Sequence, residues 1–182
     1  MQGGHLLGNA ILFFLVLLPV TRAALRNITI DDAQGDEVTG AKPIYTPPNQ
    51  WYAISSQSRC DGICDPNPGI DEAYFSTWHV ATGFPTEPSR IEFKFNGSAV
   101  FIYCILAGNA RPNSQTHLSL LVDGVEMDTF HWIPTNNTPP FYYQVPVLSA
   151  SALESRTHFV VVLSAVTAID YSVIFFDFAV YR

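Results

Sequence analysis

Alternation of apolar and polar residues is the pattern that most constrains the fold of this chain. In residues 90–95 every second side chain is apolar, and a period of two recurs in residues 118–122 and 141–147. A half-buried strand produces this period, whereas no stretch beyond residue 23 keeps the 3.6-residue spacing of an amphipathic helix over a dozen positions. We therefore expect an all-β protein.

Further segments carry strand and turn signals. Residues 99–106 are apolar throughout, as a central strand covered on both faces requires. Residues 28–30, 125–132, 158–163 and 171–181 also favour strands. Asn96-Gly97 and Asp123-Gly124 indicate tight hairpin turns, and Pro146 indicates a sheet edge or a bulge. About eight strands at roughly ten-residue spacing predict an antiparallel β-sandwich or jelly roll. Residues 31–81 are expected to be mostly loop, although their aromatic content excludes a disordered linker.

The first 23 residues are typical of a signal peptide. An apolar run from Ala10 to Leu18 ends at Pro19, and small residues at Thr21 and Ala23 suit signal peptidase. This run is much shorter than the roughly 20 residues that span a bilayer. The alternatives are a buried N-terminal strand and an uncleaved anchor. We expect cleavage after Ala23 and one domain over residues 24–182. The protein is expected to be secreted and extracellular, with the cell wall as one site where it associates.

Glycosylation and cysteine signals agree with export. Asn27, Asn96 and Asn136 each begin an Asn-x-Ser/Thr triplet, and we expect N-glycosylation at these positions. Cys60 and Cys64 are expected to form a disulfide within a short loop. Cys104 lies in an apolar run and is expected to be a buried free thiol.

Charge excludes several partners. The formal net charge is −7, and only 14% of the residues are charged. Nucleic acid recognition requires clustered cations, so it is not expected here. Acidic lipid surfaces are disfavoured for the same reason, and no apolar segment of spanning length follows the leader.

A series of short motifs resembles a known family. In chain order these are Ile28-Thr29-Ile30-Asp31-Asp32, Gly35-Asp36, Tyr45, Trp51, Cys60, Cys64, Thr77-Trp78-His79, Phe95-Asn96-Gly97-Ser98-Ala99-Val100, Val122-Asp123-Gly124 and Phe175-Phe176-Asp177-Phe178-Ala179-Val180-Tyr181. They are similar to a family of secreted or single-span proteins from mushroom-forming fungi, whose ectodomain resembles galactose-binding-like jelly rolls. The resemblance implies that fold and a cell-surface or wall setting, without an established activity or catalytic residue.

The chain departs from this family in two places. Many relatives continue into a Ser/Thr-rich stalk and a transmembrane helix, whereas this sequence ends at Arg182. Residues 152–158 lack the two glycines that relatives tend to have before the penultimate strand. The geometry of that turn is therefore not predicted by the resemblance.

Acidic residues suggest a calcium site. Asp31, Asp32, Asp36 and Glu37 form the densest acidic group, and clustered carboxylates suit a hard cation. The resemblance to galactose-binding-like folds implies a structural calcium between the first and last strands, which would add Asp177. The alternative for the group is a solvated turn in which aspartates hydrogen-bond to their own backbone. For Asp177 the alternatives are pairing within the fold and a place near a ligand.

Aromatic residues and one histidine are the candidate ligand-binding residues. They are Trp51, Trp78, His79, Trp132 and Tyr142. Aromatic faces suit the mixed surface of a sugar ring, but core packing would also explain these residues. A histidine that fixes a loop by hydrogen bonds is the alternative for His79.

No catalytic constellation is visible, so the leading hypothesis is a non-catalytic module that binds a carbohydrate or cell-wall polymer. The alternative is a structural or interaction ectodomain that acts in wall architecture or adhesion through protein contacts. A polysaccharide-modifying enzyme is the third hypothesis, since any two carboxylates can meet in space.

Overall fold

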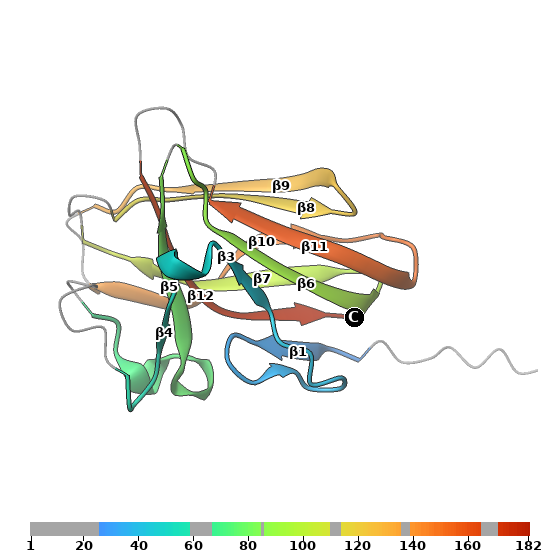
Figure 1. The fold of residues 1–182 in the computed structure, drawn as a ribbon, viewed down its shortest axis with the longest axis horizontal. Coiled ribbons are helices and arrows are strands. Elements are labelled where there is room, and N and C mark those ends of the chain that lie inside the picture. The colour runs from blue at the N-terminus through green and yellow to red at the C-terminus, as the bar shows by residue number, and fades with distance from the viewer. Residues whose placement is uncertain (1–25, 59–66, 85, 110–113, 136–138, 165–170) are drawn as a thin grey trace, which may run out of the picture.

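The computed structural model consists of two antiparallel β-sheets packed face to face, which confirms the predicted β-sandwich (Figure 1). It describes residues 26–58, 67–84, 86–109, 114–135, 139–164 and 171–182. The expected leader, Cys60, Cys64 and Asn136 lie outside these ranges. Within them, no helix has the length and hydropathy needed to cross a bilayer.

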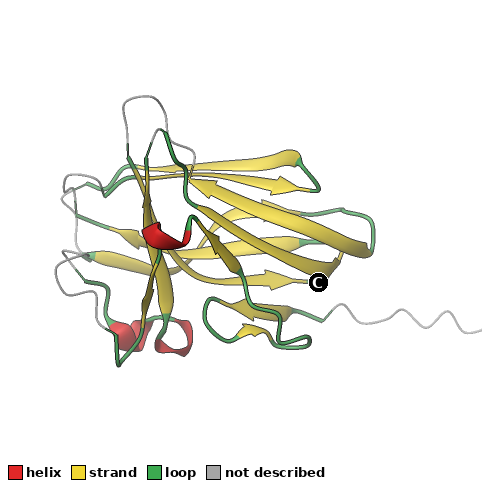
Figure 2. Cartoon of the chain, in the orientation of Figure 1, coloured by secondary structure: helices red, strands yellow, loops and turns green. Residues whose placement is uncertain are grey.

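The described residues form twelve strands and three single-turn 3-10 helices (Figure 2). The strands are β1 (Ile28–Asp31), β2 (Gly35–Asp36), β3 (Ile44–Thr46), β4 (Tyr52–Ile54), β5 (Trp78–Gly83), β6 (Arg90–Gly97), β7 (Val100–Ala107), β8 (Thr116–Val122), β9 (Val125–Trp132), β10 (Phe141–Ala150), β11 (Arg156–Ser164) and β12 (Ser172–Tyr181). The helices are η1 (Pro48–Gln50), η2 (Ile70–Glu72) and η3 (Tyr74–Ser76).

The first sheet is organised around β12, the last strand of the chain. β7 pairs with one edge of β12, and β10 pairs with the outer edge of β7. The other edge of β12 is shared: β5 pairs with residues 172–176, and β1 pairs with residues 178–181. Asp177 lies at the β-bulge between these two stretches. β4 extends the sheet beyond β5, and β2 extends it beyond β1.

The second sheet has the order β3-β6-β11-β8-β9. From β5 onward the chain crosses between the sheets at every connection except the β8–β9 hairpin. The strand partners are therefore mostly distant in sequence. This arrangement buries the alternate apolar residues of both sheets, among them Ile91, Phe93 and Phe95, in one shared core.

A second apolar cluster lies on the outer face of the first sheet. Trp78, Phe175 and Phe141 contribute to it, together with Ile54 at the end of β4 and Ala73 from the segment between β4 and β5. That segment is part of residues 31–81, which the sequence predicted to be loop. The prediction was wrong for β2, β3 and β4, because strands of two or three residues are too short to show alternation. It was also wrong at residues 78–81, which begin the six-residue strand β5. These four strands were not among the roughly eight that were expected.

The two turn signals had different outcomes. Asp123 and Gly124 have φ values of 52° and 82° and join β8 to β9 in a hairpin, as predicted. Asn96-Gly97 does not form a hairpin, because β6 and β7 belong to different sheets. A Cβ atom at Gly97 would lie 2.6 Å from the carbonyl oxygen of Arg182. The glycine is therefore needed for a close backbone approach rather than for a turn.

Other details were predicted correctly. β7 is a central strand, and Cys104 within it is buried and free. β10 is an edge strand with irregular register on both sides of Pro146. Burial raises the pKa of the Cys104 thiol, which keeps it protonated and inert.

Candidate functional site

The tryptophans predicted to bind ligand lie within the packed parts of the sandwich. Trp78 is 1% exposed and belongs to the outer apolar cluster. Trp132 is half-buried, donates its indole N–H to the Ala107 carbonyl at 2.7 Å, and contacts Tyr142 edge-on. Trp51 donates its indole N–H to the Thr46 carbonyl at 3.3 Å. These contacts fit the core-packing alternative for all four aromatic residues.

His79 and Asp32 form a largely buried pair where β1 and β5 meet along β12. His79 Nδ1 lies 2.7 Å from Asp32 Oδ2, and the Thr77 hydroxyl donates to Asp32 Oδ1 at 2.5 Å. The Tyr45 ring stacks on the imidazole at 4.0 Å, and its hydroxyl donates to the Asp32 carbonyl at 2.7 Å. These hydrogen bonds connect β1, β3 and β5, so His79 fixes the junction of three strands.

Asp31 and Asp177 lie in the same region, here called the acidic junction (Asp31, Asp32, Asp177 and His79). The backbone N–H of Asp32 donates to the Asp177 carbonyl at 3.2 Å. Asp31 Oδ1 accepts from Ala33 N and Gln34 N, at 2.9 and 2.6 Å. Asp31 therefore hydrogen-bonds its own turn, as the alternative to calcium predicted, but it is 2% exposed rather than solvated.

The acidic junction is electrostatically strained. Asp177 Oδ1 accepts from the Tyr74 backbone N–H at 2.9 Å, which lowers the carboxyl pKa, but burial and the charges of Asp32 and Asp31 outweigh this bond. The pKa of Asp177 is therefore raised to about 7. Burial also raises the pKa of Asp31.

The described residues fit a calcium ion poorly. Oδ2 of Asp31 and Oδ2 of Asp177 are buried without a hydrogen-bond partner among these residues, which would suit a cation. However, the hydrogen bonds from Thr77 and His79 already engage both carboxylate oxygens of Asp32. Within the described ranges, no three His, Cys, Asp or Glu side chains are placed to hold a metal ion. Calcium binding stays a prediction.

An open pocket of about 450 Å³ lies beside the acidic junction, at the far part of β5. β4 pairs with β5 only as far as Val80, so among the described residues no strand pairs with the next part of β5 on that edge. η1 and the turn between Phe84 and Glu87 border the opening instead. Phe84 and Glu87 exchange two backbone hydrogen bonds, at 3.2 and 3.0 Å, which close this turn. The pocket thus occupies the place that a longer β4 would fill.

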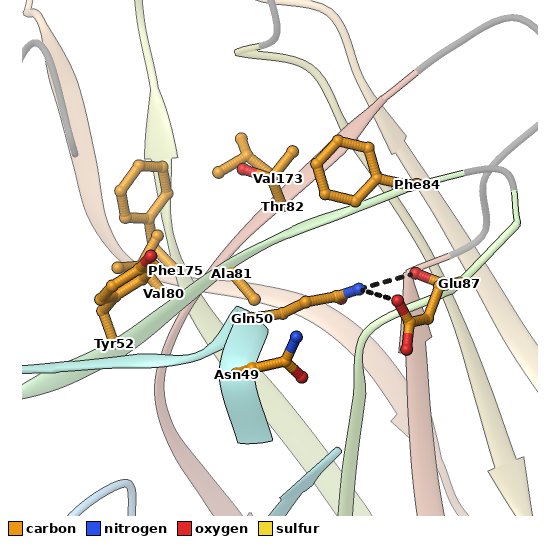
Figure 3. A pocket seen from close by; sticks show the side chains of 10 residues that line it. All are labelled: Asn49, Gln50, Tyr52, Val80, Ala81, Thr82, Phe84, Glu87, Val173 and Phe175. Carbon is orange, nitrogen blue, oxygen red and sulfur yellow. Dashed lines mark hydrogen bonds between the residues drawn. The ribbon is translucent and has the colours of Figure 1, made fainter. Parts of the chain in front are cut away.

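The pocket combines aromatic rings with polar side chains (Figure 3). Tyr52 and Phe175 lie together on one side, and Phe84 lies on the other. Tyr52 and Phe84 are 43% and 42% exposed, and Tyr171 meets the Phe84 ring edge-on at 5.6 Å. The remaining lining residues are Asn49, Gln50, Val80, Ala81, Thr82, Glu87 and Val173.

Gln50 holds the polar side of the pocket together. Its amide N–H donates to Glu87 Oε2 at 3.0 Å and to the Glu87 carbonyl at 3.4 Å (Figure 3). Its amide oxygen accepts from the hydroxyl of Ser89, which is buried, at 2.8 Å. One side chain therefore fixes η1 against the turn that carries Phe84 and Glu87.

Trp51, which was predicted to bind ligand through its aromatic face, lies beside the pocket rather than in its lining. Its neighbours Gln50 and Tyr52 line the pocket, while Trp51 packs against Tyr45. Phe84 and Glu87 were not chosen at all. The one available signal was the pair of prolines, Pro85 and Pro88, beside them, which indicates a turn but not its neighbours in space.

The two described glycosylation triplets lie far from the pocket. Asn27 precedes β1, which pairs with the end of β12, and Ser98 N donates to the Arg182 carbonyl at that same end. Val173 in the pocket wall lies near the beginning of β12. A ten-residue strand is about 30 Å long. Both Asn27 and Asn96 are exposed, and glycans there would leave the pocket open.

Comparison with known proteins supports the fold. No protein-family profile matches the chain and no curated protein matches it, so the likeness to a family of mushroom-forming fungi stays a prediction. Among solved structures, the Agl-KA catalytic domain is similar to 92% of this chain, with a TM-score of 0.51 and 12% identity. At this identity the likeness establishes the β-sandwich alone.

Other similar structures come from carbohydrate-active proteins. A family 35 carbohydrate-binding module from Clostridium thermocellum matches 78% of this chain and 99% of its own length, with a TM-score of 0.43 and 14% identity. An exo-β-1,3-galactanase from Phanerochaete chrysosporium matches 87% of this chain, with a TM-score of 0.47 and 9% identity. This chain spans 30% of that galactanase, 29% of the Agl-KA domain and 23% of a family two carbohydrate esterase from Clostridium thermocellum.

Proposed function

We propose that this chain is an exported, non-catalytic module that binds a carbohydrate or cell-wall polymer in the pocket between η1, β5 and the Phe84–Glu87 turn. One observation carries the proposal. Two exposed aromatic rings, Tyr52 and Phe84, border a pocket of about 450 Å³ whose remaining wall includes amide, hydroxyl and carboxylate groups.

The physical basis is the mixed surface of a sugar ring. Its C–H faces pack on aromatic rings, and its hydroxyls at the ring edge need hydrogen-bond donors and acceptors. Tyr52 and Phe84 provide the apolar surfaces, while Asn49, Gln50 and Thr82 provide polar atoms. The volume lies in the range of pockets that take small ligands, which favours a short sugar segment over a long stretch of polymer.

The module is proposed to be non-catalytic because the lining of this pocket includes a single carboxyl group. Glycoside hydrolases generally use two carboxyl groups that flank the scissile bond. Glu87 is the only acid among the ten residues that line the pocket, and the neighbouring Asp32 is engaged by Thr77 and His79. A polysaccharide-modifying enzyme therefore has less support than a binding module.

Affinity electrophoresis and calorimetry with soluble glucans, chitin oligomers, chitosan oligomers and pectins test the proposal. We expect Tyr52→Ala and Phe84→Ala each to weaken sugar binding about two- to tenfold, the range for loss of one stacking ring. Phe159→Ala is the matched control, because Phe159 is 40% exposed on β11 in the other sheet. Binding that Tyr52→Ala and Phe84→Ala leave unchanged would exclude the pocket.

A complete failure to bind any of these polymers would favour the alternative, an interaction ectodomain that acts through protein contacts. Release of reducing ends from any polymer would instead favour the enzyme hypothesis. The same purified protein serves for both measurements.

A further inference from the structure

The pocket contains one charge, and it is negative. Glu87 is the only charged side chain among the ten lining residues. Gln50 donates a hydrogen bond to its Oε2, and among the described residues neither a cation nor a second donor engages the carboxylate. One carboxylate oxygen is thus available to a ligand, on a chain whose formal net charge is −7.

The position of this carboxylate is defined by the fold. Glu87 closes the turn with Phe84 through two backbone hydrogen bonds. Gln50 contacts both the side chain and the carbonyl of Glu87, and Ser89 holds the other end of the Gln50 amide. A carboxylate fixed in this way is prepared for a charge-assisted hydrogen bond without a large loss of side-chain freedom.

The aromatic rings favour the same ligand charge. The faces of Tyr and Phe rings carry negative electrostatic potential and attract cations within about 6 Å of the ring centre. Tyr52 and Phe175 lie on one side of the pocket, and Phe84 and Glu87 lie on the opposite side (Figure 3). Rings on two walls together with a carboxylate form an environment that favours an ammonium group over an uncharged amide or a carboxylate.

We propose that this pocket selects a sugar that carries a protonated amine, as in unacetylated glucosamine oligomers, and that Glu87 determines this specificity. The inference rests on the proposed carbohydrate binding and specifies the class of sugar that is bound. An N-acetyl group would replace the charged donor with a neutral amide. A uronic acid would place a second carboxylate beside Glu87, where repulsion between like charges opposes binding.

Calorimetry with the mature protein tests the inference with four oligomers of equal length: glucosamine, N-acetylglucosamine, glucose and galacturonic acid. We expect the glucosamine oligomer to bind about tenfold or more tightly than the other three. Glu87→Gln should reduce its affinity to that of the acetylated oligomer. Glu126→Gln removes the same charge from an exposed position on β9 in the other sheet, and should leave the affinity unchanged.

The outcomes separate this inference from the proposed function. Binding of glucose or N-acetylglucosamine oligomers at least as tightly as glucosamine oligomers would overturn the amine specificity and leave carbohydrate binding intact. An equal loss in Glu87→Gln and Glu126→Gln would assign the effect to net charge and also overturn it. Choline bound as tightly as the glucosamine oligomer would overturn the sugar assignment and indicate a general ammonium site. Absence of binding to all four oligomers and to the longer polymers would refute the proposed function itself.

Discussion

The acidic junction and the pocket are neighbours along β5, but their polar groups have different surroundings. At the junction, His79 and Thr77 hydrogen-bond to Asp32, and the strand ends cover all three aspartates. In the pocket, Glu87 is exposed, and Tyr52 and Phe84 each have more than a third of their surface exposed to solvent. The clustered aspartates of the sequence therefore form a buried structural contact at the acidic junction. The exposed pocket lies further along the same strand, β5.

The largest expected effect is a loss of stability when β5, the strand that both regions share, is disrupted at Trp78. Trp78 begins β5 and is 1% exposed, so Trp78→Ala should leave a large cavity and lower the free energy of unfolding by about 3–5 kcal/mol. Chemical denaturation measures this loss. The indole N–H of Trp78 has no hydrogen-bond partner among the described residues, so Trp78→Phe should lower the free energy of unfolding by less than half as much as Trp78→Ala. Equal losses for the two variants would contradict this account.

The second effect is a pH dependence that belongs to the junction alone. The pKa of Asp177 is about 7 in the folded protein, against an ordinary value of 3.8. Between pH 3.8 and about pH 7, the folded state therefore keeps a proton on this carboxyl group that the unfolded state has released. The contribution of this group to stability should therefore be highest below about pH 4. It should fall by roughly 4 kcal/mol as the pH rises from about 4 to 7. Asp31, whose pKa is raised by burial, acts in the same direction.

Asp177→Asn should remove most of this dependence and stabilise the protein at about pH 8, while it changes little below about pH 4. Melting temperatures across pH measure the difference. Asp71→Asn, an exposed acid in η2, is the control and should follow the wild type. An Asp177→Asn profile parallel to the wild type would show that the junction is not the source.

A smaller effect should link stability to the pocket. Gln50→Ala leaves the buried Ser89 hydroxyl without its acceptor and frees η1 from the Phe84–Glu87 turn. We expect a loss of about 1–2 kcal/mol in the free energy of unfolding, together with weaker sugar binding. Gln57→Ala, at an exposed position, should affect neither. Unchanged binding in a folded Gln50→Ala protein would show that this brace does not shape the site.

The smallest expected effect concerns calcium. Hard cations take six to eight oxygen ligands, and among the described residues the junction has only two buried carboxylate oxygens without a partner. We therefore expect no change in melting temperature when calcium replaces a chelator at about pH 8. A clear rise that Asp177→Asn abolishes would instead establish a calcium site and would make the junction, like the pocket, a place for ligands.

The long strands of this fold were predictable because each carries its own pattern. Residues 90–95 alternate, so the burial of Ile91, Phe93 and Phe95 on one face of β6 follows from local sequence. The Asp123-Gly124 hairpin was predictable for the same reason, since the two positive φ values are a local requirement. The short strands β3 and β4 were not, because three residues are too few to show alternation.

The candidate site shows the same division. Its acidic and aromatic residue types were visible in the sequence, but burial decided which of them remain open. Trp51 and Tyr52 are adjacent, yet one packs against Tyr45 and the other borders the pocket. Only the geometry of η1 and β4 separates them.

By itself, the sequence determined an all-β sandwich with a central apolar strand and a buried thiol, because alternation and apolar runs act through local backbone geometry. The tertiary structure alone decided that Asp32 would meet His79 and that Gln50 would meet Glu87. These pairs are 47 and 37 residues apart. Asp32 meets His79 because β1 and β5 pair with neighbouring stretches of the same edge of β12. Gln50 meets Glu87 because β5 continues beyond the point where its pairing with β4 ends. No local pattern records where a neighbouring strand stops.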